Sequence, residues 1–306
     1  MQISFSPVAS LETRLAWPSD PVDMVLDTDA YNEIDDQFAL VYALLSVERI
    51  RVQAVYAAPF YNDRSKSPGD GMHKSYEEIN RILGLMNRES NGFAFKGSES
   101  WLPDDNTAVR SPAVDDLISR ARQRRDTPLY VVAIGAITNV VSAILTAPDI
   151  RANIIVLWLG GHPLGWRHTR EFNLQGDPAA SRLLFDCGVP VVLFPCINVA
   201  EALTTTLAEL ERHVRGCGEI GAYLCNIFEH YEDNDLRSPG SSKVIWDLAP
   251  LGWLVNQDWF ETDLATSPIL TRDLTWSRDI TRHHLRVATR IRRDGVFSDL
   301  FGKLNF

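Results

Sequence analysis

A dense group of carboxylates stands near the N-terminus of this 306-residue chain. The segment 27–36 carries four aspartates, Asp27, Asp29, Asp35 and Asp36, and apolar runs precede and follow it. Like charges this close repel one another, and a bound cation is the usual way in which a protein tolerates them. Carboxylate oxygens suit a hard metal ion. We therefore interpret the segment as a metal site.

Three other interpretations use the same spacing. The last two aspartates could cap a helix, but capping accounts for one or two carboxylates and not for four. An EF-hand loop that starts at Asp27 is excluded, because it needs Gly and Glu where the chain has Asn32 and Phe38. A phosphatase-type pair of Asp27 and Asp29 with Mg²⁺ stays open, although it leaves the other two aspartates without a role.

The composition indicates a globular protein with ample material for a core. Hydrophobic residues make up 45% of the chain, and 40 acidic against 30 basic side chains give a net charge of −10. Nucleic acid is an unsuitable partner, because no basic stretch could follow its phosphates. No apolar run reaches the length of a membrane span, and residues 1–17 lack a signal-peptide core. We expect a cytoplasmic protein without membrane contact.

The cysteines and histidines suggest no second metal site. Cys187, Cys196, Cys217 and Cys225 show no Cys-x-x-Cys spacing, so we expect buried thiols in a reducing compartment and not a disulfide framework. The seven histidines are dispersed along the chain, and no zinc site is predicted.

Alternating strand and helix patterns must position the carboxylates. Apolar, β-rich runs occur at 22–26, 52–58, 93–95, 129–134, 154–159 and 189–194. Helical patterns lie between most of them, at 35–45, 76–86, 113–124, 137–145 and 179–185, and Ser111-Pro112 and Asp177-Pro178 mark two helix starts. This alternation predicts an α/β fold with an open, mostly parallel, Rossmann-like sheet and helices on both of its faces.

The last third of the chain is less regular. It has helical patterns at 207–233 and 244–255 and a strand-like pattern at 267–289. No repeat, low-complexity stretch or linker interrupts the chain, so we expect residues 1–306 to form a single domain.

Polar clusters follow several of the predicted strands. Besides 27–36 they lie at 61–63, 135–139 and 160–173. In an open parallel sheet, ligands bind beyond the carboxyl ends of the strands, so these segments predict the active site. Neither a Gly-x-Gly-x-x-Gly fingerprint nor a Walker pattern is present, which argues against a nucleotide cofactor.

Taken in chain order, these motifs resemble the nucleoside hydrolases of the inosine–uridine type. They are Asp27-x-Asp29 with Asp35-Asp36, Ile134-Gly135-Ala136-Ile137-Thr138-Asn139, Glu171-Phe172-Asn173 with Asp177-Pro178, and Trp246-Asp247, and together they span about residues 22 to 256. The order of four motifs at strand ends makes the resemblance specific. It implies hydrolysis of the N-glycosidic bond of ribonucleosides to ribose and free base, a role in purine salvage, and a homo-oligomer, either dimer or tetramer.

The resemblance also implies a calcium ion. Its ligands would be Asp29, Asp36, Asp247 and the backbone carbonyl of Ile134, with water and ribose hydroxyls completing the shell. All-oxygen ligation of this kind suits calcium. Asp29 would in addition be the general base that takes a proton from a metal-bound water.

Further residues would bind the nucleoside by the same resemblance. Asp35, Asn62 and Asn173 would hold the 2′- and 3′-hydroxyls of the ribose, and Glu171 would reach toward the 5′-hydroxyl. For Asn62 and Glu171 an ordinary solvated loop position is the alternative.

Two features depart from the family's pattern. The family usually has Pro-Gly-x between Asp29 and the aspartate pair, whereas this chain has Ala30–Ile34, two residues more. Trp246 stands where many members carry a histidine proposed to protonate the departing base. A purine-preferring branch has tryptophan there and is thought to activate the base by stacking, so Trp246 suggests purine preference, with core packing as the alternative.

Other side chains are candidates to complete the base pocket, namely His73, Trp101, Trp166 and His168. The first functional hypothesis is a calcium-dependent ribonucleoside hydrolase. The second is a protein that keeps the metal and ribose pocket but binds a ribosylated ligand without turnover, because its first loop is altered and the histidine is missing. A metal-dependent phosphohydrolase is the third.

Overall fold

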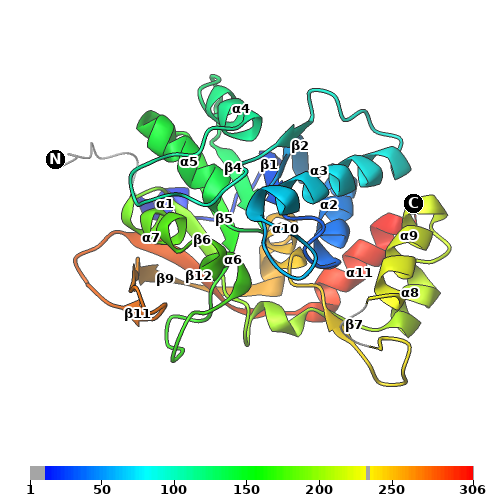
Figure 1. The fold of residues 1–306 in the computed structure, drawn as a ribbon. Helices are drawn as coiled ribbons and strands as arrows, with labels where there is room; N and C mark the ends of the chain where they lie inside the picture. The colour runs from blue at the N-terminus through cyan, green and yellow to red at the C-terminus, as the bar shows by residue number, and fades with distance from the viewer. Residues whose placement is uncertain (1–10, 232–234, 306) are drawn as a thin grey trace.

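An eight-stranded sheet forms the centre of the computed structural model, which describes residues 11–231 and 235–305 (Figure 1). In spatial order the strands are β3 (Ala94–Lys96), β2 (Ile50–Ala57), β1 (Val22–Thr28), β4 (Leu129–Ala133), β5 (Ile154–Leu159), β6 (Val191–Phe194), β12 (His284–Ile291) and β9 (Phe260–Thr266). All neighbours are parallel except β12 and β9. This confirms the predicted open, mostly parallel sheet of an α/β fold.

Helices cover both faces of the sheet, because successive side chains of a buried strand point to opposite sides. On β1, Met24 and Leu26 belong to one hydrophobic core and Val25 to the other. The first core also contains side chains of α2 (Asp35–Leu45), α3 (Pro68–Leu85), α10 (Leu248–Val255) and α11 (Arg293–Leu304). The second contains those of α4 (Pro112–Ala121), α5 (Thr138–Thr146) and α7 (Pro178–Asp186), which lie together on one side in Figure 1.

Shorter elements complete the fold. They are α1 (Leu11–Arg14), α6 (Phe172–Gly176), α8 (Leu207–His213), α9 (Gly218–Glu229), the 3-10 turns Pro148–Ala152, Ala200–Ala202 and Gln257–Trp259, and two small ribbons, β7 (Thr204–Thr205) with β8 (Lys243–Val244) and β10 (Ile269–Leu270) with β11 (Trp276–Ser277). Within the described residues no helix is long and apolar enough to span a membrane. The four cysteines are free thiols, two of them buried and two partly exposed.

The first two thirds of the chain follow the predicted elements. Helix α2 and strand β5 have the predicted bounds, and both predicted proline starts are confirmed, since Ser111 and Asp177 accept hydrogen bonds from the first turns of α4 and α7. Helix α3 begins at Pro68, earlier than predicted. The prediction missed its first turns because the glycines there weaken the helical pattern of the sequence. Gly71 in that turn is required by packing: a Cβ there would lie 2.0 Å from the carbonyl oxygen of Phe60.

The last third differs more from the prediction. The helix expected at 207–233 is two helices, α8 and α9, and the second begins at Gly218, whose φ of +71° falls in the region that glycine adopts without strain. Residues 232 and 233 of that prediction lie outside the described residues. The strand-like pattern at 267–289 comprises β10, β11 and part of β12, and the helix expected at 244–255 begins only at Leu248. Strand β9 and helix α11 were not predicted.

Asn139 ties the carboxyl ends of the central strands together. Its Nδ2 donates to Oδ1 of Asp27 (2.7 Å) and to the carbonyl oxygen of Ala57 (3.2 Å), and its Oδ1 accepts the backbone N–H of Ser98 (2.7 Å). Gly97 leaves the room for this amide, because a Cβ there would lie 2.4 Å from Nδ2. One buried side chain thus fixes the ends of β1 and β2 and the segment after β3.

We expect Asn139→Ala to lower the free energy of unfolding by about 2–4 kcal/mol, because it leaves the Asp27 carboxylate and the Ser98 N–H buried without this partner. Urea denaturation would measure the loss. Asn91→Ala, at an exposed position, is the matched control and should stay within about 0.5 kcal/mol of the unmodified protein. Equal stability of the two variants would contradict the role given to Asn139.

Candidate functional site

The carboxyl ends of the central strands surround a cavity of about 280 Å³. It is lined by Asp29, Asn32, Glu33, Asp35, Asp36, Ile134, Leu159, His162, Glu171, Phe172, Asn173, Cys196, Ile197, Trp246 and Asp247. All but one of the predicted site residues are in this list, and they come from segments that follow β1, β4, β5 and β8. The missing one is Asn62.

Asp35, Asp36 and Asp247 form a tight group of buried carboxylates. One oxygen from each can be chosen so that all three lie within 4.8 Å of one another. Asp35 and Asp36 stand in the first turn of α2, and Asp247 directly precedes α10, but neither helix has a side-chain cap hydrogen bond. Helix capping therefore does not account for these carboxylates. The geometry groups Asp35, predicted to bind ribose, with two predicted metal ligands.

Asp29 lies in the same cavity, just beyond the end of β1. Its backbone carbonyl accepts the N–H of Asn32 (2.7 Å), while its side-chain Oδ2 is buried and has no hydrogen-bond partner within the described part of the chain. Gly135 makes room for this carboxylate, because a Cβ at that position would lie 3.1 Å from Oδ1 of Asp29. A buried oxygen without a partner is costly unless a cation or a proton satisfies it.

Burial and mutual repulsion shift the ionisation of these carboxyl groups. Burial, with the charge of Glu33 in addition, raises the pKa of Asp35 to about 7, and burial with the charge of Asp35 raises the pKa of Asp36 to about 8. The pKa values of Asp29 and Asp247 are raised well above their ordinary range, first by burial and then by the neighbouring carboxylates. Without a cation the group therefore retains protons near neutral pH, and a divalent cation would take their place.

Asp27 is turned away from this group. It does not line the cavity, and its Oδ1 accepts the hydrogen bond from Asn139. Burial raises its pKa to about 7, while the bond from Asn139 acts in the opposite direction. A phosphatase-type mechanism would need the carboxylates of Asp27 and Asp29 at one substrate, and the structure does not bring them together there.

Glu171 serves two purposes at the wall of the cavity. Its carboxylate accepts the backbone N–H groups of Gly161 (2.7 Å), Asn173 (3.0 Å) and Leu174 (3.0 Å), so it caps helix α6. Burial raises the pKa of Glu171, and these backbone hydrogen bonds lower it. Glu171 also lines the cavity, and its carboxylate is engaged by the backbone, so it is not an ordinary solvated loop residue.

Asn173 bridges two strands at the floor of the cavity. Its Nδ2 donates to the carbonyl oxygens of Ile134 (3.0 Å) and Leu159 (3.1 Å), which end β4 and β5. Both amide hydrogens are thereby used, and Oδ1 remains as an acceptor. The Ile134 carbonyl keeps a second lone pair for another partner.

Trp246 contacts both the core and the cavity. It packs against the first hydrophobic core and also lines the cavity. The backbone of Trp246 lowers the pKa of Asp35, against the larger effect of burial, so this residue lies beside the carboxylate group.

Asn62 does not occupy its expected place. Its Nδ2 donates to Oδ1 of Asn32 (2.7 Å), and Asn32 and Glu33, from the lengthened loop, line the cavity instead. The structure does not place Asn62 at the cavity wall, for a physical reason: the two additional residues place Asn32 between Asn62 and the cavity.

Sequence reasoning missed His162. It is 5% exposed, lines the cavity and has a buried Nδ1 without a hydrogen-bond partner among the described residues. Burial lowers its pKa, and so does His168, whose ring centroid lies 5.6 Å away. Its position in the sequence could have identified it, because it directly follows Gly160-Gly161 at the carboxyl end of β5. The four residues suggested for the base pocket, His73, Trp101, Trp166 and His168, are not in the lining.

Comparison with known proteins agrees with this geometry. The sequence profile of the inosine-uridine preferring nucleoside hydrolases matches residues 24–298. The pyrimidine-specific ribonucleoside hydrolase RihA of Klebsiella pneumoniae is 27% identical over 264 residues, which are 78% of this chain and 81% of that protein. RihA of Salmonella paratyphi A is 28% identical over 267 residues, with the same coverage of both chains.

Solved structures show the same fold. An inosine-guanosine nucleoside hydrolase superposes with a TM-score of 0.74 at 17% identity, covering 93% of this chain and 98% of that one. A purine-preferring ribonucleoside hydrolase from Gardnerella vaginalis gives 0.71 at 19% identity, covering 92% and 98%. The chain therefore belongs to the inosine-uridine preferring nucleoside hydrolases, enzymes that cleave the N-glycosidic bond of ribonucleosides.

Proposed function

We propose that this protein is a calcium-dependent hydrolase of ribonucleosides with a preference for purines. The observation that carries the proposal is the convergence of Asp29, Asp35, Asp36 and Asp247 on the floor of one cavity. Members of this family depend on a metal, and four buried carboxylates with a backbone carbonyl offer only oxygen ligands, as calcium prefers. No lysine or arginine is among the described residues that line the cavity. Lys243, whose charge lowers the pKa of Asp35, is paired with Glu33.

The residues that would hold the ion are Asp29, Asp36, Asp247 and the carbonyl of Ile134, and Asp35 stands close enough to join them. When bound, Ca²⁺ would supply positive charge beside a water molecule and the ribose hydroxyls. Calcium acidifies water less than zinc does, so a carboxylate base is needed next to it. The Oδ2 of Asp29, buried and without a hydrogen-bond partner among residues 11–231 and 235–305, suits that base.

The remaining residues would bind and stabilise the sugar. Asp35 and the free Oδ1 of Asn173 would accept hydrogen bonds from the 2′- and 3′-hydroxyls, and Glu171 would reach the 5′-hydroxyl. Cleavage of a glycosidic bond builds positive charge on the ribose ring, and the surrounding carboxylates stabilise that charge. Trp246 would stack on the departing base.

The family resemblance and the free thiols support a proposal about the assembly, the pathway and the compartment of this protein. We propose a homo-oligomer, dimer or tetramer, that acts in purine salvage in the cytoplasm, where free thiols such as those of this chain persist. Light scattering coupled to gel filtration would measure the assembly.

A reducing-sugar assay on a panel of nucleosides tests the proposed reaction. Release of free ribose with calcium present is the expected result. Nucleoside binding without ribose release would instead support a non-catalytic binder of ribosylated ligands. Release of phosphate from a nucleotide would support a phosphohydrolase.

The pH dependence of stability tests the metal site. Because the folded, ion-free protein binds protons at Asp35 and Asp36 more tightly than the unfolded chain, their contribution is fully present below about pH 4 and is lost as pH rises through 7 to 8. In chelator the melting temperature should therefore fall over this range. Calcium should restore it, and by more at about pH 8 than at about pH 5. A melting temperature that calcium leaves unchanged at every pH would contradict the proposed metal site.

Asp29→Asn tests the general base. The variant keeps an oxygen ligand but cannot accept the proton, so we expect kcat to fall by roughly 10²–10⁴-fold while ribose still binds in calorimetry with calcium. Asp126→Asn, at an exposed position, is the matched control and should keep full activity. Unchanged turnover in Asp29→Asn would assign activation of water to another residue.

Trp246→Ala tests the base contact. Stacking of a base on an aromatic ring is worth ~1–3 kcal/mol, so kcat/KM for inosine should fall about ten- to a hundred-fold. Trp246→Phe should retain part of the activity, and a nitrophenyl riboside, whose leaving group needs no activation, should lose less than inosine. Hydrolysis of uridine as fast as inosine by the unmodified protein would refute the purine preference, which the pyrimidine-specific relatives make a real alternative.

A further inference from the structure

We infer that Asn32, on the loop that this chain lengthens, donates a hydrogen bond to a ribose hydroxyl, and that Asn62 is its positioning residue. The inference deepens the proposed ribonucleoside hydrolysis and rests on it. Asn32 lines the cavity beside Asp29, to whose carbonyl its backbone N–H donates (2.7 Å). That neighbour is the proposed general base, so the side chain of Asn32 lies at the sugar end of the ligand, close to where the glycosidic carbon must sit.

The hydrogen bonds determine which atom of Asn32 is free. The backbone N–H of Arg64 can only donate, so the Asn62 atom 2.9 Å from it is the acceptor Oδ1. The other amide atom of Asn62 is then Nδ2, which donates to the side chain of Asn32 (2.7 Å) and to its carbonyl oxygen (3.4 Å). Asn32 accepts this bond through Oδ1, so its Nδ2 is left as a donor.

Nδ2 of Asn32 has no partner among the residues that the structure describes, although the residue is only 9% exposed. The cavity wall around it is rich in carboxylates, which accept hydrogen bonds. A donor at this wall complements a ligand oxygen, whereas the carboxylates complement ligand hydroxyl protons. A ribose hydroxyl can satisfy both, because it donates to one group and accepts from another.

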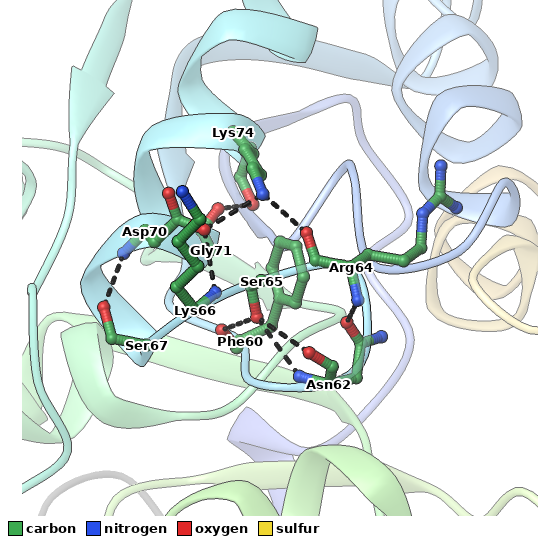
Figure 2. A network of polar contacts seen from close by, with 10 residues as sticks. Phe60, Asn62, Arg64, Ser65, Lys66, Ser67, Asp70, Gly71 and Lys74 are labelled. Atoms are coloured by element: carbon green, nitrogen blue, oxygen red, sulfur yellow. Dashed lines mark hydrogen bonds and ion pairs between the residues drawn. The ribbon is translucent and has the colours of Figure 1, made fainter.

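A network of polar contacts holds the loop that carries Asn62 (Figure 2). The backbone N–H of Asn62 donates to Oγ of Ser65 (3.1 Å), and Nζ of Lys74 donates to the carbonyl of Arg64 (2.6 Å) and pairs with Asp70 (2.9 Å). These contacts anchor the loop after β2 to helix α3. Asn62 therefore presents its amide in one orientation before any ligand arrives, which is what a positioning residue requires.

The residues on both sides of Asn32 make contacts that hold the lengthened loop in place, and these contacts do not involve the Asn32 side chain. The Arg64 guanidinium lies 4.5 Å from the centre of the Tyr31 ring, and its Nη1 lies 3.4 Å from the carbonyl oxygen of Glu33. The Glu33 carboxylate pairs with Lys243. Truncation of Asn32 should thus leave the loop in place, so that a kinetic effect can be separated from unfolding.

Kinetics of single and double variants test the inference. We expect Asn32→Ala and Asn62→Ala each to lower kcat/KM for inosine by about ten-fold, the effect of one lost hydrogen bond, with an unchanged melting temperature in calcium. Because Asn62 acts through Asn32, the double variant should lose no more than Asn32→Ala alone. Asn91→Ala is the exposed control. Additive losses would mean that Asn62 contacts the ligand itself and would overturn the inference.

Two further comparisons identify the contact. Asn62→Asp keeps an acceptor for the Arg64 N–H but turns the Asn32 amide so that Nδ2 faces residue 62, and it should lose as much activity as Asn62→Ala. On the 2′- or the 3′-deoxynucleoside, whichever lacks the contacted hydroxyl, Asn32→Ala and the unmodified protein should react at equal rates. A ten-fold loss on these two analogues and also on the 5′-deoxynucleoside would show that Asn32 does not bind a ribose hydroxyl.

Binding of free ribose separates this inference from the proposed function. If the unmodified protein binds ribose in calorimetry with calcium but cleaves no nucleoside, the proposed hydrolysis fails. In that case a roughly ten-fold weaker ribose affinity of Asn32→Ala still supports the contact. If the unmodified protein cleaves nucleosides and Asn32→Ala matches it in rate and in ribose affinity, the hydrolysis stands and the inference is overturned.

Discussion

Repulsion among buried carboxylates is the constraint on which this structure depends. Asp35, Asp36 and Asp247 are close enough together to bind one ion, and Asp29, in the same cavity, has a buried oxygen without a partner in the described part of the chain. Two distant chain segments, 29–36 and the one that carries Asp247, must be brought together at a cost in electrostatic energy, so the scaffold has to be stable in its own right. The parallel sheet provides this stability, with a hydrophobic core on each face. Its order places β1 between β2 and β4, where the connections diverge and open a crevice.

The predictability of the fold varies with how regular each segment is. Asp35–Leu45 and Ile154–Leu159 were predicted with their observed bounds, because each is a continuous apolar segment with a clear start and stop. The antiparallel edge strand β9 was missed, since much of it is exposed and it carries little apolar signal. The single helix expected at 207–233 failed because its apolar pattern continues across a break at Gly218, and only tertiary packing decides that two short helices form there.

Prediction of the site depended on different information. The order of motifs along the chain located Asp29, Asp36, Asp247 and Asn173 at one cavity, because parallel strands end at the same edge of the sheet. It did not determine where side chains on loops point. Asn62 was expected at the ligand, but the lengthened loop comes between it and the cavity, and loop conformation has no periodicity from which this could be predicted. His162 was missed although its position after β5 was known.

Unused hydrogen-bonding capacity at the cavity wall separates the motif residues that can act on a ligand from those that build the site. Asp27 has a buried Oδ2 without a partner among the described residues, but it does not line the cavity. Asp177 has both carboxylate oxygens engaged, by the N–H groups of Ala180 and Leu102 and by the hydroxyl of Thr138, and it lies outside the cavity. Asn139 is likewise fully engaged below the cavity floor. Asp29 has a free Oδ2, and the amides of Asn32 and Asn173 each leave one atom without a partner among the described residues, the first a donor and the second an acceptor. A motif therefore identifies the neighbourhood of a site, while the remaining donors and acceptors specify the chemistry of the ligand that completes it.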